Sequence, residues 1–178
     1  MSQERRHPNV VRVDDVEPRE MSQGDFVQKA RRLGQMAGNR ALGCTYYELP
    51  PGKTSFPFHF HSALEEAIYV LEGEGTLRIG KEQVGIACGD YVGFPPGPDC
   101  SHTLSNRGKE PLRYLCISGP AIPMTLDIIS YPDSRKIALA AGIDPTKVKW
   151  HEGAWIMKLI KEDQPEVGYF DDEPLARK

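Results

Sequence analysis

The sequence predicts an all-β domain built as an antiparallel sandwich or barrel. Six or seven short runs rich in Val, Ile, Thr, Tyr and Phe lie between residues 42 and 118, at spacings of about 8 to 12 residues. Each run is closed by a turn signal, and the 178 residues include 17 Gly and 15 Pro. Because no helical pattern separates the runs, their strands are expected to pair antiparallel.

Composition narrows the class of protein further. The length suits one domain with a real core, and a net charge of −3 makes a nucleic-acid partner unexpected. No apolar run approaches the roughly 20 residues of a membrane-spanning helix, and the start MSQERRHPNV lacks a signal segment. We therefore expect a soluble, cytoplasmic chain. Its four scattered cysteines form no C-x-x-C pair and are expected to be reduced.

Residues 1–41 are expected to form an arm and one short helix. The chain up to about Gln23 has few large apolar residues, with a possible edge strand at Val10–Val13. From Asp25 onward, apolar residues recur at spacings of four, three and three, which places them on one helical stripe before the stop signal Gly38-Asn39. These stripe residues are Phe26, Ala30, Leu33 and Met36.

Residues 42–130 are expected to form the barrel. Gly80-Lys81 has the length of a two-residue hairpin loop, and Gly73 and Gly75 suit a positive φ or a bulge. The expected six or seven strands come from LGCTYYEL, FPFHFH, AIYVLEGEG running into TLRIG, EQVGI, DYVGF, CSHTL and PLRYLCIS.

Residues 131–178 are expected to be a C-terminal extension that packs on the barrel. The segment PMTLDIISYPDS, which leads into it, could be a strand, and HEGAWIMKLIKED could be a strand or a short helix. The acidic end suits a solvated tail, which Trp150, Trp155 and Tyr169 could dock.

Three histidines and one glutamate form the main chemical pattern. His59 and His61 are two residues apart in a strand-like segment, so both imidazoles point to the same face. Glu66 begins the next strand, and His102 lies on a later one. A single histidine is more often structural than a ligand, but this set suits a first-row divalent ion with open positions. Zinc, iron, manganese and nickel all remain open.

Two segments resemble the two motifs of the cupin superfamily. The segment PGKTSFPFHFHSALEEAIYVLEGEG is similar to the first motif, at Gly52, His59, His61, Glu66 and Gly73. The segment GDYVGFPPGPDCSHTLSN is similar to the second, at Gly89, Pro95, Gly97, His102 and Asn106. The spacings before His59 and His102 are one and two residues longer than the family pattern.

The resemblance implies a double-stranded β-helix, a jelly-roll-like barrel, that forms a homodimer. It implies that His59, His61, Glu66 and His102 are metal ligands, since Glu66 but not Glu65 leaves six residues before Gly73. The alternative is Glu65 as the ligand and Glu66 as its solvent-facing neighbour. Cys100 could lie beside the site or be a structural thiol. Aromatic residues that could line a pocket, but would more often be core, are Tyr46, Tyr69, Tyr91 and Trp155.

The function expected from this pattern is a metal-dependent enzyme that acts on a small metabolite. Cupins with these ligands include dioxygenases, decarboxylases and isomerases of sugars or sugar phosphates, and the ligands alone do not choose among them. The alternative is a non-catalytic module that binds or senses a small, sugar-like molecule. A structural or storage role is disfavoured, because buried polar groups are costly to keep without a use.

Overall fold

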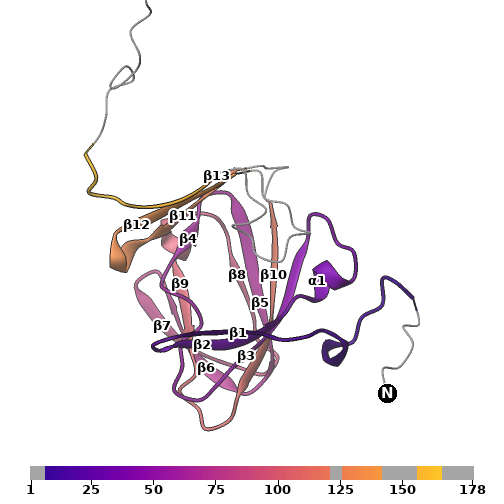
Figure 1. The fold of residues 1–178 in the computed structure, drawn as a ribbon. Helices are drawn as coiled ribbons and strands as arrows, with labels where there is room; N and C mark the ends of the chain where they lie inside the picture. The colour runs from indigo at the N-terminus through magenta and orange to yellow at the C-terminus, as the bar shows by residue number, and fades with distance from the viewer. Residues whose placement is uncertain (1–6, 121–125, 142–155, 166–178) are drawn as a thin grey trace, which may run out of the picture.

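A computed structural model describes residues 7–120, 126–141 and 156–165, and its strands form three antiparallel sheets (Figure 1). The largest sheet has the order β1 (Arg19–Gln23), β2 (Phe26–Arg31), β3 (Gly43–Leu49), β10 (Leu112–Pro120), β5 (Leu64–Glu72) and β8 (Tyr91–Phe94). The three-stranded sheet has the order β7 (Glu82–Ala87), β6 (Glu74–Ile79) and β9 (His102–Ser105).

The four-stranded sheet lies across one end of the other two, at the top of Figure 1. Its order is β13 (Ile156–Lys161), β12 (Lys136–Ala141), β11 (Leu126–Tyr131) and β4 (Phe60–His61). The short helical turns of the described residues are η1 (Val13–Asp15), α1 (Leu33–Met36), η2 (Pro98–Cys100) and η3 (Pro132–Ser134). The predicted all-β, antiparallel architecture is therefore confirmed.

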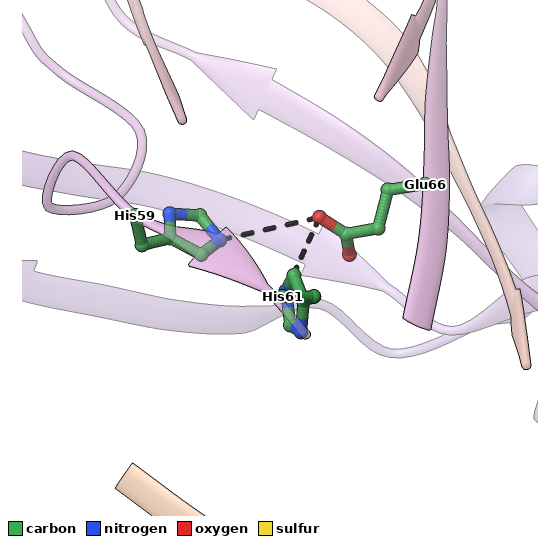
Figure 2. Close-up of side chains that lie close together, drawn as sticks. All are labelled: His59, His61 and Glu66. Carbon is green, nitrogen blue, oxygen red and sulfur yellow. Dashed lines mark ion pairs between the residues drawn. The ribbon is translucent and has the colours of Figure 1, made fainter. Parts of the chain in front are cut away.

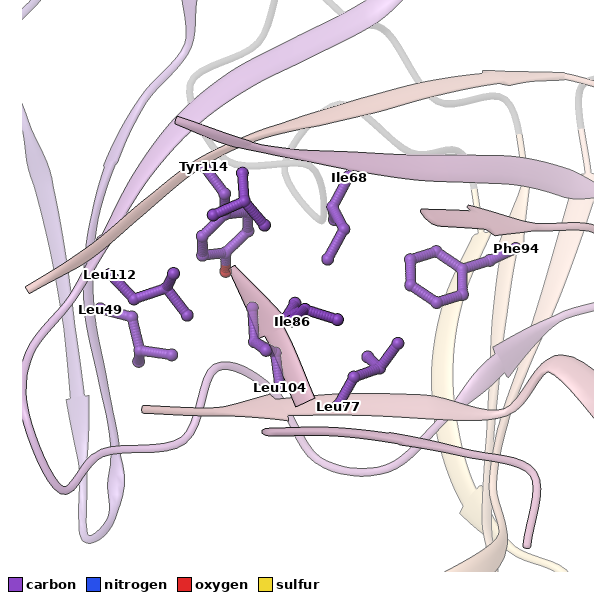
Figure 3. Close-up of a cluster of buried hydrophobic side chains, with 9 residues drawn as sticks. Leu49, Ile68, Leu77, Ile86, Phe94, Leu104, Leu112 and Tyr114 are labelled. Carbon is purple, nitrogen blue, oxygen red and sulfur yellow. The ribbon is translucent and has the colours of Figure 1, made fainter. Parts of the chain in front are cut away.

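The core lies between the six-stranded and three-stranded sheets (Figure 3). Side chains alternate along a strand, so one face of each of β3, β5, β6, β7, β8, β9 and β10 contributes to this interior. Leu49 and Leu112 are fully buried, and Phe94 lies near the end that carries the histidines. The buried cluster consists of Leu49, Ile68, Val70, Leu77, Ile86, Phe94, Leu104, Leu112 and Tyr114.

The predicted helix beginning at Asp25 is wrong. Residues 19–31 form the β1–β2 hairpin, which turns at Gly24 with φ +60°, and only Leu33–Met36 is helical. The apolar spacing misled because residues four apart share a face in a strand as well as in a helix. Between Phe26 and Ala30 lies Gln28, which is buried and hydrogen-bonded to Ser55 and Tyr114.

The arm and the C-terminal region also differ from expectation in detail. Val10–Val13 is not a strand, and residues 13–15 form the turn η1. The undecided segment around residues 156–161 is a strand, while β12 was not anticipated. This strand, KIALAA, is rich in alanine, and its Ala138 and Ala140 are fully buried. The proposed docking residues Trp150, Trp155 and Tyr169 lie outside the described residues.

The turns between barrel strands follow the sequence closely. Gly80 and Lys81 connect β6 to β7, and Gly80 has φ +54°. A Cβ atom at Gly80 would lie 2.8 Å from the Asp99 carbonyl oxygen. Both the positive φ and this close approach therefore require glycine at the turn. All four cysteines are free thiols, as expected. Within residues 7–120, 126–141 and 156–165, no helix is long and apolar enough to cross a membrane.

Candidate metal centre

His59 and His61 enter the barrel from one extended segment. The backbone of His59 exchanges two hydrogen bonds with that of His102, at 3.2 and 2.8 Å, and His61 pairs with Ile129 of β11. The two-residue period directs both imidazoles to the same side, with ring centroids 5.2 Å apart. The His102 ring lies 4.7 Å from the His59 ring. Backbone pairing thus gathers the three predicted imidazoles.

Glu66, on β5 of the six-stranded sheet, points toward His59 and His61 (Figure 2). Its Oε2 atom lies 3.4 Å from Nε2 of His61, 3.4 Å from Nε2 of His102 and 4.0 Å from Nε2 of His59. Ligand atoms of His59, His61 and Glu66 all lie within 4.8 Å of one another. Glu65 is exposed. The structure therefore brings the four predicted residues together and turns Glu65 away.

Each imidazole is held through its Nδ1 atom. Nδ1 of His59 lies 2.8 Å from the Pro57 carbonyl oxygen, and Nδ1 of His102 lies 3.0 Å from the Cys100 carbonyl oxygen. Nδ1 of His61 lies 2.5 Å from Oδ2 of Asp127. An acceptor at Nδ1 holds the proton there and leaves the Nε2 lone pair for a metal ion. The imidazoles of His59 and His61 and the carboxylate of Glu66 therefore suit a divalent transition metal, and Nε2 of His102 contacts the same carboxylate.

Burial and neighbouring charges shift the pKa values of the side chains at the centre. Burial, and then the neighbouring rings of His102 and His61, lower the pKa of His59 to about 4. Burial also opposes the charged form of His61, but hydrogen bonds to Asp127 and Glu66 outweigh it and raise that pKa to about 9. For Glu66, hydrogen bonds from His102 and His61 outweigh burial and hold its pKa well below the usual range. The Glu66 carboxylate is thus paired with the imidazoles of His61 and His102.

Aromatic rings form the wall of the centre. The Phe94 ring stacks on His102 with centroids 3.7 Å apart, and the Tyr131 ring stacks on His59 at 5.9 Å. Phe56 meets the His59 ring edge-on at 6.2 Å. The four proposed ligand side chains remain 11% to 15% exposed. The centre is therefore largely shielded from water but is not sealed.

Sequence reasoning missed Asp127 and Tyr131. Both lie on β11, beyond the segments that resemble cupin motifs. Their sequence neighbourhood suggested only a strand. The alternation Asp127, Ile129, Tyr131 on the barrel-facing side was the one available signal.

Several other candidates lie away from the centre. Cys100 belongs to the turn η2, and its carbonyl oxygen, not its thiol, is the group that contacts His102. Tyr69 and Tyr91 are 40% and 66% exposed, so they do not line an interior pocket. Tyr46 lies beside the charged groups of Glu48 and Arg113.

Asn106, from the second motif, is structural. Its side chain donates to the carbonyl oxygens of Leu49 and Glu110 and accepts from the amide of Gly108. These bonds tie down the loop that follows β9.

Comparisons with known proteins agree with this geometry. Residues 45–118 match the family model of the cupin domain. A candidate sugar phosphate isomerase from Acidithiobacillus ferrooxidans has a TM-score of 0.73 and 27% identity, and the match covers 90% of this chain and 96% of that one. A sugar phosphate isomerase from Silicibacter pomeroyi has a TM-score of 0.72 and 20% identity over 90% and 97% of the two chains. The chain therefore contains a cupin domain, which forms a double-stranded β-helix barrel.

Two further matches cover less of the chain. A predicted oxalate decarboxylase from Thermotoga maritima has a TM-score of 0.54 and 25% identity over 62% of this chain and 98% of its own. An uncharacterised protein of Methanocaldococcus jannaschii is 37% identical over 62 residues, which are 35% of this chain. That match spans 48%, about half, of the relative's length. The likeness to the Acidithiobacillus protein thus extends well past the cupin domain itself.

Proposed function

We propose that this protein is a divalent-metal-dependent enzyme that acts on a small, oxygen-rich metabolite, with sugar phosphate isomerisation as the first candidate reaction. The observation that carries the metal site is the convergence of three imidazoles on Glu66 while protein oxygens hold each Nδ1 atom. The candidate reaction is supported by the likeness to the Acidithiobacillus protein over 90% of the chain.

Each part of the proposed site would have a separate role in binding or catalysis. His59, His61, Glu66 and His102 would hold the ion, which when bound supplies a Lewis acid that polarises a substrate oxygen. Phe94, Tyr131 and Phe56 limit the water around the centre. Burial and then Asp127 raise the pKa of Tyr131, so its phenol stays neutral at neutral pH and can donate a hydrogen bond to a substrate beside His59.

The first test combines metal analysis with turnover. The purified protein would be stripped, reloaded separately with Fe²⁺, Mn²⁺, Zn²⁺ or Ni²⁺, and incubated in D₂O with a panel of aldose and ketose phosphates. We expect nuclear magnetic resonance to show interconversion in at least one metal form, and none in His61→Ala. A protein that binds no metal refutes the metal site.

The same panel distinguishes the other reactions that cupin ligands support. Oxygen consumption with enols or diols would indicate a dioxygenase, and release of carbon dioxide a decarboxylase. If the metal-loaded protein converts no substrate while a sugar-like ligand raises its melting temperature, the protein is a binding or sensing module and not an enzyme.

We also propose a cytoplasmic homodimer whose partner is a small molecule, without nucleic acid or membrane. Strand β1 forms one edge of the six-stranded sheet, and an edge strand can pair with a second copy. Sedimentation equilibrium tests the assembly: a mass of about 20 kDa, that of one chain, would refute the dimer.

A further inference from the structure

A carboxylate outside the cupin domain reaches into the proposed metal centre. Asp127 lies on β11, beyond the matched residues 45–118, and its Oδ2 atom is 2.5 Å from Nδ1 of His61. We propose that Asp127 is a positioning residue, which fixes the ring of His61 for metal binding and makes that binding depend on β11. This inference rests on the proposed metal-binding function.

The Asp127 carboxylate is itself held in place. Its Oδ1 atom accepts hydrogen bonds from the Ala63 amide at 3.3 Å and the Ser62 hydroxyl at 3.4 Å. The same hydroxyl accepts from the Ile128 amide at 3.0 Å, and the Ser62 amide donates to the Ile128 carbonyl at 2.9 Å. The side chain is 10% exposed. Both carboxylate oxygens are therefore occupied, and Oδ2 is directed at His61.

The three imidazoles differ in where their Nδ1 partner comes from. His59 and His102 each use the carbonyl oxygen two residues earlier in the chain, so local backbone geometry orients both rings. His61 uses a side chain 66 residues away. The His61 ring is therefore held in this orientation only when β11 pairs with β4, through Ile129 and His61. The metal centre and the docking of β11 should therefore stabilise each other.

An asparagine at residue 127 would be nearly isosteric but chemically different. It has one oxygen, so it cannot accept from both His61 and the Ser62–Ala63 pair. If the oxygen keeps the Ala63 amide, the NH₂ group faces Nδ1 and favours the tautomer with the proton on Nε2, the atom that would bind the metal. Loss of such a partner lowers metal affinity by roughly 10- to 100-fold.

Asp133 provides a matched control for this substitution. It follows β11 directly, in η3, and its carboxylate makes two hydrogen bonds to Arg78, at 2.6 and 3.0 Å. Asp133→Asn thus removes a charge-assisted contact of the same segment without touching His61.

The test is a titration of the full-length, metal-stripped protein with Co²⁺, followed by its visible absorption. We expect Asp127→Asn to weaken Co²⁺ binding by roughly 10- to 100-fold, while Asp133→Asn stays within about threefold of the wild type. A wild-type protein that binds no Co²⁺ overturns the proposed function and this inference with it. Wild-type binding that Asp127→Asn leaves unchanged overturns this inference alone.

A spectroscopic measurement needs no folded variant at residue 127. In the Zn²⁺-loaded wild type, the proton on Nδ1 of His61 should give a downfield, slowly exchanging resonance, assigned by its loss in His61→Ala. The same resonance should survive in Asp133→Asn. Its absence from the wild type would contradict the bond to Asp127.

Discussion

Without a metal, the stability of this protein should fall steeply as the pH rises through the range in which His61 loses its proton. The His61 imidazole lies between two carboxylates, 2.5 Å from Asp127 and 3.4 Å from Glu66. These contacts raise the His61 pKa from 6.5 to about 9, against the effect of burial. The folded state therefore binds this proton more tightly than the unfolded chain does.

The sign and size of the effect follow from linkage. The contribution of His61 is fully present below the unfolded pKa of 6.5 and is lost as the pH rises through the folded pKa of about 9. The shift corresponds to about 3 kcal/mol in all, of which about 2 kcal/mol should disappear between pH 6.5 and about pH 8.5.

Urea unfolding in the presence of a chelator, at several pH values across that range, measures this loss. Other groups titrate as well, so the comparison is with His61→Asn, whose free energy of unfolding should depend much less on pH. The reasoning is refuted if wild type and variant lose stability in parallel between pH 6.5 and about pH 8.5.

Four substitutions test other parts of the structure. Asn106→Ala should lower the free energy of unfolding by about 3 kcal/mol, because the carbonyls of Leu49 and Glu110 lose their donor; a change below about 1 kcal/mol in urea unfolding would contradict this. Gly80→Ala should cost about 1–2 kcal/mol by the same assay, since φ is +54° and the Asp99 carbonyl blocks a Cβ atom; an unchanged midpoint would count against it. Cys100→Ala should leave Co²⁺ affinity within about twofold, since only the backbone of that residue contacts His102; a tenfold loss would assign the thiol a role. Phe94→Ala should lower the free energy of unfolding, measured by calorimetry, by about 3–5 kcal/mol. It should also leave the His102 ring less restrained, because the Phe94 ring stacks on it.

Much of the barrel and its centre was predictable from local patterns. Some features depend only on neighbouring residues: the shared strand face of His59 and His61, the two-residue turn at Gly80-Lys81 and the strand-forming runs. Such properties need no knowledge of the rest of the chain. Glu66 was separable from Glu65 by its spacing in the motif, and the structure turns it inward.

The errors lie where local spacing fits two structures equally well. Phe26 and Ala30 share a face in a helix and in a strand, and it is the pairing of β2 with β1 and β3 that decides for the strand. The alanine-rich β12 has weak strand propensity and forms because it pairs with β11 and β13 and buries Ala138 and Ala140.

The sequence by itself determined the all-β class, the barrel and the four residues that meet at the proposed metal centre. Only the tertiary structure decided what surrounds them: Asp127 on His61, Tyr131 on His59 and Phe94 on His102. The physical reason is distance along the chain. The Asp127–His61 hydrogen bond joins residues 66 apart and depends on the pairing of β11 with β4, so no short-range pattern encodes it.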